Sequence, residues 1–109
     1  MADAEHIVGY EVLFVGVATT VEELVGRRRR LHMSLTDAVD AGLTVAVEAA
    51  EAAEAVHEGV RVVPAYEDAR RMQRQLQRGE GPVTLFVLEN YSNERLGSVS
   101  LHAVWAPTT

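Results

Sequence analysis

Cysteine and lysine are both missing from this chain of 109 residues, and aromatic side chains make up only 6% of it. Without cysteine there can be no disulfide framework, no cysteine-ligated metal and no thiol nucleophile. The longest run without a polar or charged side chain, residues 12–18, is far shorter than the roughly 20 residues that cross a bilayer. The first residues are acidic, unlike the basic start of a signal peptide. We therefore expect a cytoplasmic protein with no membrane segment.

The charges are unbalanced, because the 10 basic residues, all arginine, face 16 acidic ones and leave a net charge of −6. Hydrophobic residues make up 48% of the chain, which is typical of a globular protein. A chain of this length has room for one hydrophobic core, so we expect a single domain over residues 1–109.

Hydrophobic patterning in the first half predicts a strand followed by two helices. Residues 6–18 are apolar on both alternating faces, which favours a central strand covered on both sides. Thr20 and Glu23 have the spacing of a capping box, which predicts a helix to about Met33. A second helix is predicted over residues 37–58, with Ser34 as a cap. Its acidic residues share one arc, and small apolar residues line the opposite arc.

The second half predicts strands and one more helix. The expected elements are a strand over 60–63, a helix over 65–78, a strand over 83–88, a turn over 90–97 and a strand over 98–106. Within that helix, Glu67 is placed for an i, i+4 pair with Arg71. The order β-α-α-β-α-β-β predicts an α/β or α+β domain of two or three layers. We expect parallel pairing across the helices and a C-terminal antiparallel hairpin, which together make a mixed sheet.

The sequence offers little for catalysis or metal binding. None of the four histidines lies at the i, i+4 spacing of a helical metal pair, so we expect no metal and no cofactor. No serine lies in a Gly-x-Ser-x-Gly motif, and we expect no catalytic residue. Ser98 and Ser100 share a strand face with His102, which permits a hydroxyl–imidazole pair. Alternation along any solvated strand would produce the same grouping.

Arginines are concentrated in two groups, which hold eight of the ten basic residues: Arg27, Arg28, Arg29, Arg30, Arg70, Arg71, Arg74 and Arg78. Nucleic-acid binding is disfavoured by the negative net charge and by the lack of aromatic residues among the arginines. The acidic arc of the 37–58 helix is an alternative partner for the arginines, either within one subunit or between copies. Arg28 falls on an apolar helix face, where it either reaches a carboxylate such as Glu11 or extends its charged end to water.

We therefore predict a non-catalytic module that associates with itself or with another protein. Its candidate interaction residues are Arg28, Arg70, Arg74, Arg78, Glu48 and Glu51. The alternative is a small-molecule-binding or small enzymatic domain with a pocket near Thr19, Thr20 and Glu89. A third hypothesis is nucleic-acid binding through the arginine-rich helices.

Overall fold

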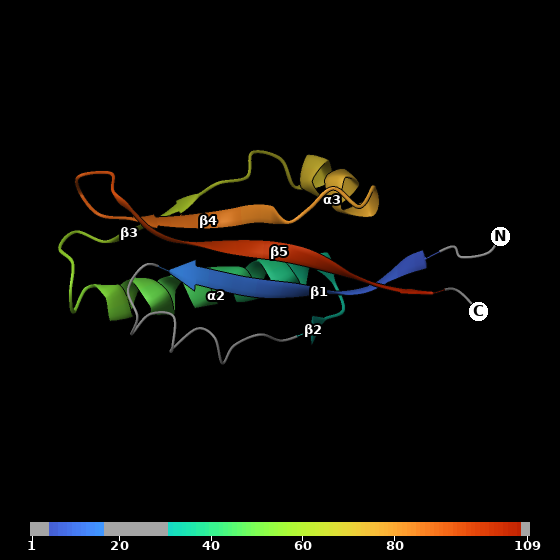
Figure 1. The fold of residues 1–109 in the computed structure, drawn as a ribbon, viewed down its shortest axis with the longest axis horizontal. Helices are drawn as coiled ribbons and strands as arrows, with labels where there is room; N and C mark the ends of the chain where they lie inside the picture. Colours follow the sequence, from blue (N-terminus) through green and yellow to red (C-terminus); the bar gives the residue numbers. More distant parts are fainter. Residues whose placement is uncertain (1–4, 17–30, 108–109) are drawn as a thin grey trace.

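The computed structural model describes residues 5–16 and 31–107, which form an α+β domain with the predicted order of elements (Figure 1). The elements are β1 (Glu5–Gly16), β2 (Leu31–His32), α2 (Leu35–Ala53), β3 (Arg61–Pro64), α3 (Ala69–Gln77), β4 (Val83–Glu89) and β5 (Arg95–Pro107). The helix predicted over residues 20–33 lies largely outside the described residues. Its last part is wrong, because Leu31 and His32 pair with β1 as a strand.

The five strands lie in the order β2-β1-β5-β4-β3, and every described pair of neighbours is antiparallel. The C-terminal hairpin of β4 and β5 is confirmed, whereas the parallel pairing expected across the helices is not found. The sheet is therefore antiparallel throughout its described strands instead of mixed. The connections explain this result: α2 leads from one edge strand of the sheet to the other, and α3 joins the adjacent antiparallel strands β3 and β4.

Helix α2 lies along one face of the sheet, behind the strands in Figure 1. Its buried side consists of small residues: Ala38, Gly42, Val45, Ala46, Ala49, Ala50 and Ala53. The approach is close, because a Cβ on Gly42 would lie 2.7 Å from Leu85 Cδ1. The predicted Ser34 cap is confirmed, since the backbone N–H of Asp37 donates to Ser34 Oγ at 3.1 Å. The helix ends at Ala53, earlier than the predicted Glu58.

Helix α3 begins at Ala69, four residues later than predicted. Asp68 caps it, because its Oδ1 accepts the backbone N–H of Arg70 at 2.9 Å. The chain before the cap follows the sheet, and the N–H of Ala65 donates to the Leu85 carbonyl at 2.8 Å. Glu67 therefore precedes the helix, and the predicted i, i+4 ion pair with Arg71 is absent among the described residues.

One buried core joins the sheet to both described helices, and Met72 and Leu76 of α3 belong to it. The opposite face of the sheet is more open: Leu13 is half-buried and Val15 is 59% exposed. We expected both faces of β1 to be covered. Neither α2 nor α3 covers the face that carries Leu13 and Val15. β5 lies between β1 and β4, and its polar residues Ser98 and Ser100 lie on this open face, as half-buried side chains.

Candidate functional site

The pocket predicted from the sequence depends on residues that the structure places only in part. Thr19, Thr20 and Arg28 lie outside the described residues. Glu89 lies at the end of β4, where its Oε1 accepts a hydrogen bond from Nε of Arg61 at 3.1 Å. The same carboxylate oxygen forms an ion pair with Nη2 of Arg61 at 3.0 Å. The Glu89 carboxylate therefore links β4 to the edge strand β3, and a pocket near Thr19 and Thr20 stays a prediction.

Ser100 and His102 do meet, with Ser100 Oγ 3.2 Å from Nε2 of the imidazole. A serine nucleophile has to give its proton to the imidazole, and a third group has to orient that ring. Here the hydroxyl also lies within hydrogen-bond reach of the Leu13 carbonyl, at 3.5 Å. In the described part of the chain, no side chain is hydrogen-bonded to the other ring nitrogen of His102. The geometry is that of a polar pair on a sheet surface.

Metal-ligand clusters and membrane-spanning helices are both absent from the described residues. These residues contain no group of three or more His, Asp or Glu side chains arranged to hold a metal ion. Neither α2 nor α3 has the length and apolar character that crossing a bilayer requires.

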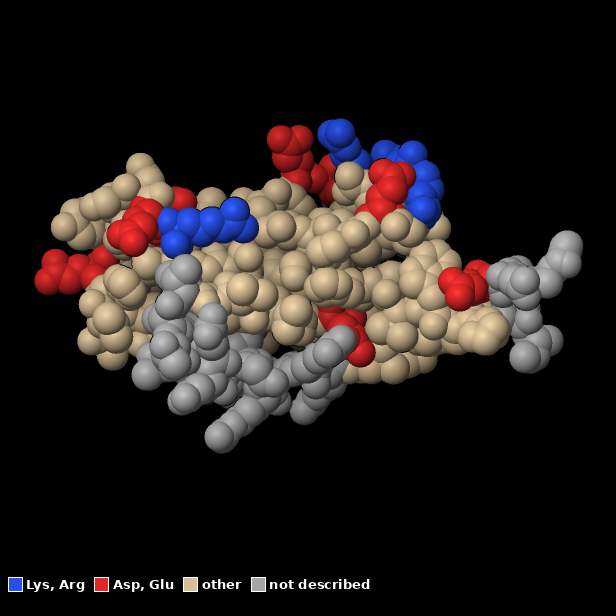
Figure 2. All heavy atoms as spheres, in the orientation of Figure 1, with Lys and Arg blue, Asp and Glu red and all other residues tan. Residues whose placement is uncertain are grey.

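The arginines of α3 gather at one corner of the molecule, as Figure 2 shows. Arg70 and Arg74 are exposed, and neither has an ion pair among the described residues. Arg78 differs, because its Nε lies 3.2 Å from Oε2 of Glu80. We call the exposed surface formed by Arg70 and Arg74 the basic face of α3.

The outward side of α2 carries carboxylates around two apolar side chains. Leu43 is 46% exposed and Val47 is 42% exposed. Asp40, Glu51 and Glu54 surround them on the same side of the helix and are exposed. We call these five residues the acidic face of α2. Glu48, a predicted interaction residue, is half-buried at the border of this face, whereas Glu51 is exposed as predicted.

Sequence reasoning identified the acids of this face but missed its apolar centre. Val47 falls within the helical arc of the acids and Leu43 lies just beyond its edge, so the signal was present in the periodicity. The predicted pairing of α2 with the arginines inside one subunit can be followed only for α3, because Arg27, Arg28, Arg29 and Arg30 lie outside the described residues. No ion pair joins α2 to α3 among the described residues, and Asp40, Glu51 and Glu54 have no hydrogen-bonded or ionic side-chain partner there.

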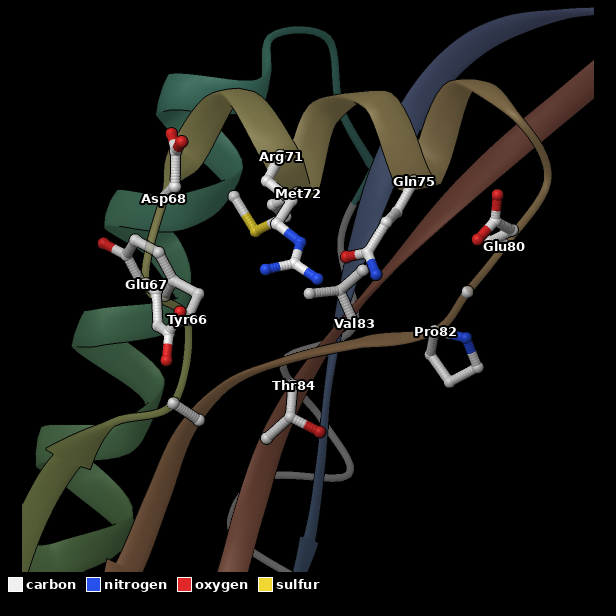
Figure 3. A pocket seen from close by; sticks show the side chains of 12 residues that line it. Tyr66, Glu67, Asp68, Arg71, Met72, Gln75, Glu80, Pro82, Val83 and Thr84 are labelled. Atoms are coloured by element: carbon white, nitrogen blue, oxygen red, sulfur yellow. The ribbon is translucent and has the colours of Figure 1, made fainter.

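A cavity of about 690 Å³ lies between α3 and the beginning of β4 (Figure 3). Arg71 and Gln75 extend from α3 into this space, and Val83 extends toward it from β4. Tyr66 lines one end, where its ring packs edge-on against Phe86 with the ring centres 6.1 Å apart. Sequence reasoning missed this cavity, because it exists only where α3 stands away from β4.

Comparisons with protein-family models, with characterised proteins and with solved structures find no match to this chain.

Proposed function

We propose that this protein is a non-catalytic association module in which two copies bind each other, the acidic face of α2 against the basic face of α3. The observation that carries the proposal is the separation of charge on two helices of one chain. Each face is exposed, and its charged groups have no ionic partner among the described residues. A second copy supplies the opposite charge to each face.

The composition of the acidic face suits such a contact. Protein interfaces commonly have an apolar centre and a polar rim. Leu43 and Val47 supply that centre, and the carboxylates form the rim. Burial of the two apolar side chains favours affinity, while the arginine–carboxylate pairs determine the register and the choice of partner. Exposed ion pairs alone are worth about 0–1 kcal/mol each, so the apolar centre is required.

A twofold axis makes the arrangement reciprocal. In a twofold dimer, any contact between surface i and surface j occurs twice. The acidic face of each copy then meets the basic face of its partner, and both faces of both copies are covered. The net charge of −6 opposes the approach of two copies in general. The basic face is therefore the part of the second copy to which the acidic face is attracted.

Charge reversal tests the proposal directly. An acid-reversed variant carries Glu51→Arg and Glu54→Arg, and a base-reversed variant carries Arg70→Glu and Arg74→Glu. Each variant alone brings like charges together, so we expect self-association to weaken at least about tenfold. A mixture of the two variants restores opposite charges at both contacts. We therefore expect the mixture to associate as tightly as the wild-type protein in sedimentation velocity, with one variant fluorescently labelled.

The matched controls reverse exposed charges outside both faces, with Glu58→Arg and Arg95→Glu. These variants should self-associate like the wild-type protein, and circular dichroism should show that all variants are folded. The proposal is wrong if either reversed variant still self-associates with wild-type affinity. It is also wrong if the mixture of the two reversed variants fails to associate.

A further inference from the structure

Four charged residues line the cavity between α3 and β4, and two of them already have local partners. Asp68 accepts the backbone N–H of Arg70 at 2.9 Å as the cap of α3. Glu80 lies 3.2 Å from the guanidinium of Arg78. Glu67 and Arg71 have neither a hydrogen bond nor an ion pair in the parts of the chain that the structure describes. The cavity thus has one uncommitted charge of each sign.

These two charges are supplied by different segments. Arg71 extends from α3 into the cavity, while Glu67 belongs to the extended segment before the helix cap (Figure 3). A guanidinium matches the planar geometry of a carboxylate and binds it with two hydrogen bonds. A carboxylate such as that of Glu67 attracts an ammonium group. Both side chains are exposed, so both are accessible to a ligand in the cavity that carries an ammonium group and a carboxylate.

The rest of the lining is partly apolar. Met72 is only 2% exposed, Val83 is half-buried, and Tyr66 is held by its edge contact with Phe86. These groups favour an aliphatic side chain, and Gln75 adds an amide for hydrogen bonding. A volume of about 690 Å³ lies within the usual range of small-molecule sites.

We propose that this cavity binds a zwitterionic α-amino acid with an apolar side chain, its carboxylate on Arg71 and its ammonium group on Glu67. A doubly charged phosphate fits less well, because Glu67 and Asp68 repel it and Arg71 is the single cation of the lining. The site is independent of the association proposed above, since neither Arg71 nor Glu67 belongs to the acidic face of α2 or the basic face of α3.

Three related ligands test the two contacts separately in isothermal titration calorimetry. L-Leucine has both charged groups, N-acetyl-L-leucine lacks the ammonium group, and L-leucinamide lacks the carboxylate. We expect saturable binding of L-leucine and at least about tenfold weaker binding of each derivative. The inference is overturned if L-leucine shows no saturable binding up to about 10 mM. It is also overturned if the three ligands bind equally.

Variants of the intact protein assign the contacts to residues. Arg71→Gln should weaken L-leucine binding at least about tenfold. It should also abolish the preference of the protein for L-leucine over L-leucinamide, a result that general loss of structure would not produce. The matched control, Arg95→Gln, removes an exposed arginine that lies outside the cavity and outside both association faces, and should bind like the wild-type protein. Glu67→Gln should abolish the preference over N-acetyl-L-leucine. Unchanged preferences in both cavity variants contradict the proposal.

Discussion

At the scale of single residues, Arg70 and Arg71 show how neighbouring arginines acquire different surroundings. A helix turns by about 100° per residue, so Arg70 lies on the basic face of α3 while Arg71 lines the cavity. The cap at Asp68 determines this outcome, because it starts α3 after Glu67. Glu67 then lies outside the helix and does not neutralise Arg71, whereas a helix from residue 65 would have placed the two side chains one turn apart.

Close packing at Gly97 gives a prediction at the same scale. A Cβ there would lie 2.5 Å from Phe14 Cζ and 3.0 Å from the Val15 carbonyl oxygen. The Phe14 ring is buried in the core, and the carbonyl belongs to the paired strand, so neither can move freely. We expect Gly97→Ala to lower the free energy of unfolding by about 2 kcal/mol in urea denaturation. Ser98→Ala, a control on the open face, should change it by less than about 0.5 kcal/mol. Equal stability of the two variants would contradict this packing.

At the scale of elements, local patterns predicted the presence and the start of α2 correctly but not the residue at which it ends. The period of small apolar residues and the Ser34 cap are local signals, and both are confirmed. The helix stops at Ala53 because the following residues have no core to pack against, as the 65% exposure of Val56 shows. Propensity alone would have continued the alanine-rich helix to Glu58.

Local sequence patterns could not predict whether neighbouring strands pair parallel or antiparallel. β1 pairs with β5 from Glu5 opposite Pro107 to Gly16 opposite Gly97, so its partner comes from the other end of the chain. Apolar alternation looks the same in a parallel and an antiparallel strand, and the order of elements favoured the wrong choice. The candidate sites differ in the same way. The charged residues of α2 and α3 could be identified from the sequence, whereas the cavity depends on the tertiary arrangement of α3 and β4.

The apolar centre of the acidic face gives a prediction for α2. The double variant Leu43→Gln, Val47→Gln removes apolar area that is exposed in one copy and buried in the proposed dimer. We expect self-association to weaken at least about tenfold in sedimentation velocity, while the urea midpoint stays close to that of the wild-type protein. Val56→Gln, an exposed position outside this face, is the matched control and should leave association unchanged. A double variant that associates like the wild-type protein would exclude α2 from the interface.

At the scale of the whole molecule, the charged groups of the described residues divide into paired and unpaired ones. The Arg61–Glu89 and Arg78–Glu80 pairs form within the chain, whereas the charged groups of the acidic face of α2 and of the basic face of α3 have no ionic partner among residues 5–16 and 31–107. Figure 2 shows few charged atoms on the uncovered part of the sheet face, while arginine and carboxylate atoms lie side by side over α3 and at the opposite end of the molecule. A domain of this size leaves about a third of its surface unburied, so apolar residues such as Leu43 remain available to a second copy.

The molar mass in solution tests self-association most directly. Sedimentation equilibrium of the wild-type protein should give a mass that rises with concentration toward twice the 11.9 kDa of one chain. It should also give a mass near that of one chain for the acid-reversed and base-reversed variants at the same concentrations. A wild-type mass that stays at 11.9 kDa up to a protein concentration of about 1 mM would contradict the account.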